Sequence, residues 1–397
     1  VEAGSEIGAK RRAQQRLAQI GAGHYPVSGF NLAKNNLQVL IYGSLYAYRY
    51  QGNSNIKPGH YCLTSEAFRE KEGNDLKRIT GYYRPFGIHG FCVGNDGAHS
   101  WSRTDACLSE TCEADFREYL KARYESLEAL NRVWKSDYTA WEDVHAVTLA
   151  DAEKTGNYAP WVDHRMHGDE VFATAVTELS PQWVNAIAPD VPVGIDVVSP
   201  GTFWWHGNCA YRLAEDNAVW IPYRSVFNAK VMTSFAKTWG SRGVYAGGYN
   251  WETNTYQQRF LPWWILYNGF DSWIWFMGIH EVDSTNATPL LTAKLTPTAA
   301  YRTGAEEATE IKGGIGKLLI NTPRKRAVIA VVVSQPAVYV NAIYPGSTDR
   351  EYWGWLRTIE ERGYALDFIT ARDLAEFSDK LRSYKVVCLP YLQSMST

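Results

Sequence analysis

Residues 91–101, FCVGNDGAHSW, show how a buried strand ends in this chain. The hydrophobic run 88–93 stops abruptly at Gly94, and Asn95 and Asp96 follow it directly. In an α/β barrel the catalytic groups lie at the carboxyl ends of the strands. Asp96 is therefore a candidate catalytic acid, and the alternative is that it only forms the next turn.

Short hydrophobic runs of the same kind recur along the chain, with helix-like stretches between them. The further predicted strands are 37–43, 191–198, 218–223, 243–249 and 271–276. Helical spacing of apolar residues predicts one helix over 114–134, a second from about Asp169 to 188, and a third over 259–269. Strands that alternate with helices favour an α/β fold with a parallel sheet.

Polar residues follow the carboxyl ends of several of these runs. Besides Asn95 and Asp96 they are Asp196, Tyr223, residues 250–252, His280 and Glu281. An open doubly wound sheet would also gather ligands at its strand ends. However, neither a GxGxxG nor a P-loop pattern follows any of the runs. Both a (β/α)8 TIM-type barrel and an open doubly wound sheet fit this pattern, and nucleotide binding has no support.

A second unit is predicted to begin near Thr322. Strands are expected over 325–335, 365–370 and 384–392, with a helix over 351–364. This order is typical of the start of a doubly wound domain. The predicted domains are a barrel over 1–321 and a doubly wound domain over 322–397. Neither has enough elements to close, so we expect the chain to be incomplete at both ends.

The bulk composition excludes two classes of partner. A formal net charge of −2 gives no electrostatic case for nucleic acid or for a membrane surface. No apolar run has the roughly 18 residues that cross a bilayer. No signal peptide is visible at Val1 and the chain does not begin with Met, so the compartment stays open. The 16 Trp and 25 Tyr fit either a large core or sugar binding, because pyranose rings pack on flat aromatic faces.

Four segments resemble the glycoside hydrolase family 42 β-galactosidases, namely 60–70, 112–134, 211–223 and 381–396. The resemblance is specific over 60–134 and loose elsewhere. It implies a barrel that cleaves β-linked sugars with retention, acts on carbohydrate without a cofactor, and forms a homotrimer through a flavodoxin-like domain.

The resemblance also implies the catalytic pair. In the family the fourth strand ends in Asn-Glu, and the matching pair here is Asn95-Asp96. Asn95 is expected to bind the sugar 2-hydroxyl, and Asp96, one methylene shorter than Glu, to act as acid/base. The family nucleophile is a Glu after the seventh strand; the run 243–249 holds no acid, and the first one beyond it is Glu252. Glu252 is the expected nucleophile, with a solvent-facing loop position as the alternative.

Further residues are expected to hold the sugar. Glu281 matches an acid that binds sugar hydroxyls in the family; a rival nucleophile or a plain loop charge are its alternatives. Trp251 and Trp275 are candidates for a stacking platform, and Trp205 and Tyr223 for the pocket wall. Packing in the core is the alternative for the tryptophans.

Three cysteines match zinc positions of some family members. Cys62, Cys107 and Cys112 occupy three of the four positions, and the fourth falls at Ser109, which is a poor ligand. A structural zinc ion is therefore one interpretation. A Cys107–Cys112 disulfide and buried free thiols are the others.

The function predicted from the sequence is a retaining β-glycoside hydrolase, β-galactosidase-like, that works with two carboxylates. Two alternatives stay open. One is a catalytically weak or inactive sugar-binding barrel, which the Asp at position 96 favours. The other is a hydrolase of a different β-linked glycan, such as a mannoside or an agar-type galactan.

Overall fold

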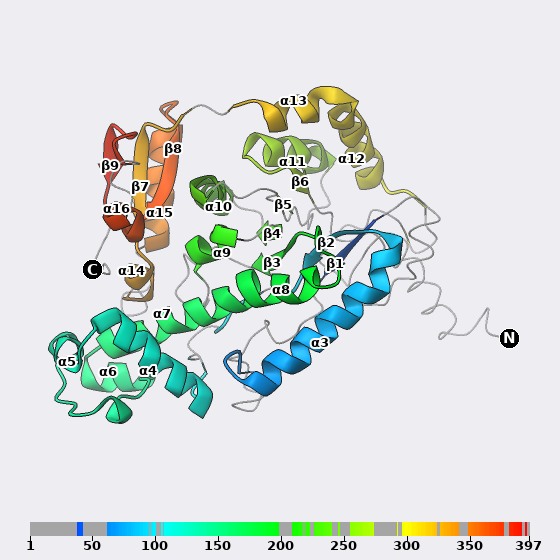
Figure 1. Cartoon of the computed structure of the whole chain (residues 1–397). Coiled ribbons are helices and arrows are strands. Elements are labelled where there is room, and N and C mark those ends of the chain that lie inside the picture. Colours follow the sequence, from blue (N-terminus) through cyan, green and yellow to red (C-terminus); the bar gives the residue numbers. More distant parts are fainter. Residues whose placement is uncertain are drawn as a thin grey trace.

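The computed structural model of the chain describes residues 38–42, 62–94, 97–100, 105, 107–197, 209–216, 219–222, 226–239, 245–246, 255–273, 292, 296–323, 326–340, 348–376, 381–390 and 394. Figure 1 shows a central group of strands with helices around it, a cluster of helices at one end, and a separate sheet near the C-terminus.

The central sheet has four parallel strands in the order β1-β2-β3-β4. They are β1 (Val39–Tyr42), β2 (Ile88–Cys92), β3 (Val193–Val197) and β4 (Val219–Pro222). A second parallel pair is formed by β5 (Tyr245–Ala246) and β6 (Ser272–Trp273). Phe91, Ile195 and Val219 are fully buried in the sheet. The predicted strands and their parallel arrangement are confirmed, although β5 and β6 are shorter than their hydrophobic runs.

The connection from β1 to β2 ends with α3 (Glu66–Tyr83), a short 3-10 turn η3 (Arg84–Phe86) and Gly87. Gly87 has φ 85°, which a residue with a side chain rarely adopts, and it turns the chain into β2. Phe68 and Leu76 of α3 are buried in the main core. At Gly73 a Cβ atom would lie 2.9 Å from the Trp183 ring, so the lack of a side chain lets the two helices approach.

A long helix carries the chain into β3. It consists of α7 (Ala159–Thr174), a π-helical turn η5 (Ala175–Leu179) and α8 (Ser180–Asn185). The prediction that this helix begins near Asp169 is wrong: it begins at Ala159, and Pro160 lies in its first turn, where a missing N–H costs nothing. Asp169 is a buried interior residue. Figure 1 shows this helix running from the α4–α6 cluster to α3.

The helical cluster between β2 and α7 is an insertion with its own core. It contains α4 (Glu110–Tyr124), α5 (Leu127–Trp134), a 3-10 turn η4 (Trp141–Asp143) and α6 (Leu149–Thr155). The single helix predicted over 114–134 is wrong. Glu125 has φ 60° and ends α4, and the Ser126 hydroxyl accepts the Ala129 N–H at 3.2 Å to start α5.

The remaining helices of the first unit follow β3. They are α9 (Ala210–Asp216), α10 (Val226–Trp239), α11 (Thr255–Tyr267), α12 (Ala299–Glu310), η6 (Ile311–Ile315) and α13 (Gly316–Asn321). Helix α11 confirms the prediction for 259–269, with Pro262 inside it. The stretch α12–α13 was not predicted; Glu307 joins it to α11 by accepting hydrogen bonds from Trp263 and Arg259, each 2.7 Å long.

The C-terminal unit has a parallel sheet of three strands in the order β8-β7-β9. Its elements are β7 (Ile329–Val333), α14 (Gln335–Val340), α15 (Thr348–Glu360), β8 (Leu366–Thr370), α16 (Ala371–Glu376) and β9 (Val386–Cys388). The three strands and α15 match those predicted from the sequence. The boundary at residue 322, the flavodoxin-like assignment and the incompleteness at both ends stay predictions.

Helices α7 and α14 join the two units through buried polar groups. The Tyr339 hydroxyl donates to the Asp169 carboxylate at 2.6 Å, and the Arg165 guanidinium lies 4.9 Å from the centre of the Tyr339 ring. Burial raises the pKa of Asp169 to about 8, although the hydrogen bond from Tyr339 and the charge of Arg165 lower it. The carboxyl group therefore holds a proton across much of the neutral range.

The Asp169→Asn variant should gain stability relative to the wild type as the pH rises from 5 to 8. An unfolded Asp loses its proton near pH 4 and the folded Asp169 near pH 8. Between these values the folded state binds more protons, so the free energy of unfolding of the wild type falls as pH rises. The difference between the two proteins should grow by about 1.4 kcal/mol per pH unit at most. Urea unfolding at several pH values measures it; a difference that stays flat would contradict the buried neutral carboxyl.

Candidate functional site

The carboxyl ends of β2 and β3 are fastened to each other. The Gly97 N–H donates to the Asp196 carbonyl at 2.7 Å, and the Asp196 N–H donates to the Gly94 carbonyl at 3.2 Å. A Cβ atom at Gly97 would lie 2.3 Å from the Ile195 side chain, so only glycine allows this approach. Both ends of the segment that contains positions 95 and 96 are therefore anchored at the carboxyl edge of the sheet.

The residues predicted for catalysis and sugar binding lie outside the part of the chain that the structure describes. This holds for Asn95, Asp96, Trp205, Tyr223, Trp251, Glu252, Trp275 and Glu281. Their roles stay predictions. The cysteines are the predicted site residues whose positions the structure gives.

His99, three positions after the candidate acid in the sequence, is a buried residue that the sequence reasoning missed. Neither ring nitrogen has a hydrogen-bond partner among the described residues, and the ring lies 6.5 Å from that of Phe172. Burial lowers the pKa of His99 to about 3, so the imidazole is neutral at ordinary pH. A His three positions after the candidate acid was the available signal, but a sequence does not show whether such a residue is buried.

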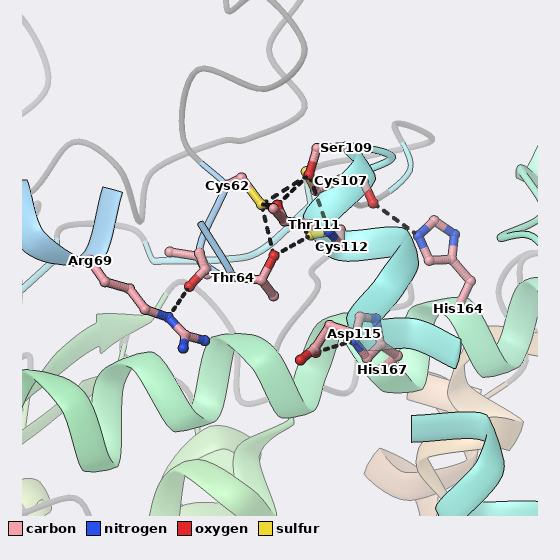
Figure 2. A network of polar contacts seen from close by, with 11 residues as sticks. Cys62, Thr64, Arg69, Cys107, Ser109, Thr111, Cys112, Asp115, His164 and His167 are labelled. Atoms are coloured by element: carbon pink, nitrogen blue, oxygen red, sulfur yellow. Dashed lines mark hydrogen bonds and ion pairs between the residues drawn. The ribbon is translucent and has the colours of Figure 1, made fainter. Parts of the chain in front are cut away.

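The three predicted cysteines converge. The sulfur atoms of Cys62, Cys107 and Cys112 all lie within 4.8 Å of one another, and the Cys62 and Cys112 sulfurs are 3.4 Å apart. Cys62 precedes α3, whereas Cys107 and Cys112 lie at the start of α4 (Figure 2). Cys62 and Cys112 are buried, and Cys107 is partly exposed. All six cysteines are free thiols, so the alternative of a Cys107–Cys112 disulfide is not what the structure shows.

Hydroxyl groups surround the sulfur cluster. The Ser109 hydroxyl donates to the Cys62 sulfur at 3.0 Å, and the hydroxyls of Thr64 and Thr111 lie 2.9 and 3.0 Å from the same atom. Hydrogen bonds from Cys107, Cys112, Ser109 and Thr111 hold the pKa of the Cys62 thiol far below its usual range, although burial raises it. The pKa values of Cys107 and Cys112 are raised, because their protons are shared within the cluster.

The cluster supplies three of the four donors of a tetrahedral zinc site. Thiolate sulfur is a ligand that Zn²⁺ prefers, and the start of a helix such as α4 favours negative charge on nearby thiols. The fourth position, Ser109, offers only a hydroxyl group, and its oxygen accepts the Cys112 N–H at 3.3 Å as the N-cap of α4. The residues therefore fit a metal ion in three positions and depart from the pattern in the fourth.

Helix α4 is held in place by α7. The Asp115 carboxylate lies 2.8 Å from the His167 imidazole, and the Phe116 ring packs against the rings of His164 and His167 (Figure 2 shows both histidines). The His164 imidazole in turn lies 3.4 Å from the Cys107 carbonyl. These two histidines thus position the cysteine-bearing end of α4.

Asp163 fixes the far end of the same insertion. It accepts hydrogen bonds from the Tyr124 hydroxyl at 2.6 Å and the Trp134 indole at 2.8 Å, and its other oxygen lies 3.2 Å from Arg123. Only 4% of the Asp163 side chain is exposed, so the charge depends on these three partners.

Comparisons with known proteins find one matching family model and several similar β-galactosidases. The model of glycoside hydrolase family 42, described as beta-galactosidase, matches residues 49–230. Beta-galactosidase BgaA of a Thermus species is 36% identical over 77 residues, which are 19% of this chain and 12% of that protein. Beta-galactosidase BglY of Alicyclobacillus acidocaldarius is 25% identical over 173 residues, 41% of this chain and 23% of that protein.

A solved beta-galactosidase from Bacillus circulans sp. alkalophilus has the same fold. It superposes with a TM-score of 0.72 at 17% sequence identity, over 97% of this chain and 65% of that one. The chain thus spans less than two thirds of that structure and less than a quarter of either curated relative.

Among the helices that the structure describes, none is long and apolar enough to cross a membrane.

The Asp163→Ala variant should lower the free energy of unfolding by about 3 kcal/mol, because it leaves Arg123 and two buried donors without their acceptor. Glu118→Ala, on an exposed position of α4 that pairs only with Lys121, should change it by less than about 0.5 kcal/mol. Urea unfolding followed by tryptophan fluorescence compares the two variants. Equal midpoints for both would show that Asp163 does not anchor the insertion.

Proposed function

Since this chain is a distant relative of glycoside hydrolase family 42, we propose that it carries the catalytic barrel of a retaining β-glycoside hydrolase of the β-galactosidase type. The observation that supports this most is the anchored end of β2. The family match covers this strand, and the Gly97–Asp196 and Asp196–Gly94 hydrogen bonds hold both sides of the Asn95-Asp96 pair at the carboxyl edge of the sheet. That edge is where barrel enzymes place their catalytic groups.

In this proposal Asp96 is the acid/base and Glu252 the nucleophile. Protonated Asp96 donates its proton to the leaving glycosidic oxygen while the Glu252 carboxylate attacks the anomeric carbon. Deprotonated Asp96 then activates water, which releases the sugar with its original configuration. The two carboxyl groups must lie about 5–5.5 Å apart for this double displacement. Asn95 binds the 2-hydroxyl of the sugar at the cleavage site.

The remaining predicted residues form the sugar pocket. Trp251, Trp275 and Trp205 supply aromatic faces for the apolar side of the ring. Glu281 and Tyr223 accept and donate hydrogen bonds at its hydroxyl groups.

The Asp at position 96 supports a second candidate function. It is one methylene shorter than the Glu of the family pattern, and displacements of this size reduce catalysis strongly. A sugar-binding barrel with weak or no turnover would have the same pocket without an effective acid. The other alternative is hydrolysis of a different β-linked glycan, such as a mannoside or an agar-type galactan, whose glycosidic oxygen the shorter acid would reach differently. The same activity assays test this alternative.

We also propose that Cys62, Cys107 and Cys112 hold a structural zinc ion, and that residues 322–397 form part of a flavodoxin-like domain of a homotrimer. The zinc proposal rests on the convergence of the three sulfur atoms. The trimer proposal rests on the resemblance alone, and the mass of the native protein in solution tests it.

The full chain should hydrolyse a nitrophenyl β-galactoside, and Asp96→Ala and Glu252→Ala should each lower kcat by about 100-fold or more. Azide distinguishes the nucleophile from the acid/base. In a variant without the nucleophile, azide attacks the anomeric carbon of the substrate directly; in a variant without the acid/base, it attacks the glycosyl-enzyme intermediate. Glu252→Ala should then yield an α-glycosyl azide and Asp96→Ala a β-glycosyl azide, as product analysis by NMR would show.

Glu118→Gln on the insertion surface is the matched control and should keep wild-type activity. Galactose binding without turnover of galactosides, mannosides or agar oligosaccharides would favour the sugar-binding alternative. Full activity in both alanine variants would reject the assigned pair.

A further inference from the structure

The side of the cysteine cluster where Ser109 lies faces solvent. Cys62 and Cys112 are buried, whereas Cys107 and Ser109 are partly exposed and Thr111 is exposed. In Figure 2 the Ser109 side chain lies beside Cys107 at the start of α4. A metal ion held by the three sulfur atoms would therefore turn its remaining coordination position toward the Ser109 side, where small molecules can reach it.

Ser109 itself is poorly suited to fill that position. A neutral hydroxyl is a weak zinc ligand compared with a thiolate. Its oxygen already accepts the Cys112 N–H at 3.3 Å as the helix cap, and its proton is directed to the Cys62 sulfur at 3.0 Å. The other lone pair of its oxygen accepts the Cys107 thiol at 3.3 Å, and a metal bond to Ser109 would have to displace this interaction.

Neighbouring side chains of the described residues do not supply a fourth ligand either. No other His, Cys, Asp or Glu in the described part of the chain joins the three sulfurs. His167 is paired with Asp115 at 2.8 Å. Asp105 accepts the Trp161 indole N–H at 2.7 Å and the Leu149 N–H at 3.0 Å, so both of its oxygens are engaged.

We infer that a metal ion held by Cys62, Cys107 and Cys112 would keep an open fourth coordination position next to Ser109, which a small external thiol could occupy in place of solvent. The inference rests on the proposed metal site and goes beyond it, because a closed four-cysteine site has no exchangeable position. The exchange is a ligand substitution: the thiol loses its proton to solvent, its sulfur binds the metal, and the water leaves. Nothing is oxidised or reduced.

Cobalt(II) in place of zinc makes the coordination visible. The reduced, metal-free full chain is titrated with Co²⁺ without oxygen, and the thiolate-to-cobalt absorption is recorded. The wild type should show the intensity of three Co–S bonds, and Ser109→Cys should exceed it by about one third, as four bonds require. Adding 2-mercaptoethanol should raise the wild type to the level of Ser109→Cys and leave that variant unchanged.

Two further variants separate the possible causes. Ser109→Ala should keep the three-sulfur spectrum and the response to thiol, because Ser109 is not a ligand. Cys388→Ser, a free cysteine on β9 outside the cluster, is the matched control and should behave as the wild type. Ser109→Cys should also retain zinc against a chelator about 10-fold better or more, the scale on which changes around a site alter metal affinity.

The outcomes distinguish the inference from the proposals on which it stands. A wild type that binds no Co²⁺ overturns the metal site and the open position together, while galactoside hydrolysis is measured independently. The open position is overturned, and the metal site stands, in two cases. In the first, the wild type binds Co²⁺ but its spectrum does not change with thiol; in the second, the wild type already shows the Ser109→Cys spectrum. Loss of the spectrum in Ser109→Ala would make Ser109 a ligand and overturn it as well.

Discussion

Helix α7 places two carboxyl groups away from water, and the positions of three parts of the molecule depend on how they are satisfied. A buried carboxyl group without hydrogen-bond partners costs several kcal/mol, so each must meet donors from another segment. Asp163 meets Arg123, Tyr124 and Trp134 of the helical insertion. Asp169 meets Tyr339 of the C-terminal unit. The same helix continues through η5 and α8 toward β3, so the insertion, the C-terminal unit and the central sheet share one support.

Different partners compensate for the burial of the two carboxyl groups. Asp163 lies beside Arg123, and an ion pair with two further hydrogen bonds compensates for burial. Asp169 receives hydrogen bonds from Tyr339, but burial dominates and its pKa rises to about 8. Burial raises the pKa of Asp163 as well, although Arg123, Tyr124 and Trp134 lower it. The insertion is thus held through a carboxyl group beside an arginine, and the contact between α7 and α14 through one whose pKa lies above neutral pH.

The anchored insertion links the cysteine cluster to the candidate catalytic edge. The chain leaves β2 at Cys92, is held at Gly97 by Asp196, and reaches the cluster at Cys107. A metal ion at the cluster would fasten the far end of the segment that begins next to Asp96 and tie it to the start of α3.

Much of the local structure could be predicted from hydrophobic patterns, and the errors have physical causes. The runs around Phe91, Ile195 and Val219 became buried parallel strands, since a continuous apolar run is stable only with both faces covered. The predicted helix over 114–134 failed at Glu125, because apolar spacing continues across a short break that only the backbone angle reveals. The helix start near Asp169 failed because an acidic residue suggests a cap, whereas this one is buried.

The sequence by itself determined the strands, most of the helices, and which residue types are available for chemistry: the Asn95-Asp96 pair after a strand and three cysteines with a serine at the fourth position. Only the tertiary structure decided that Cys62 meets Cys107 and Cys112, that Ser109 is committed to capping α4, and that Asp169 holds a proton. The reason is that local conformation follows from neighbours along the chain. Coordination and protonation depend instead on burial and on partners that folding brings from distant segments.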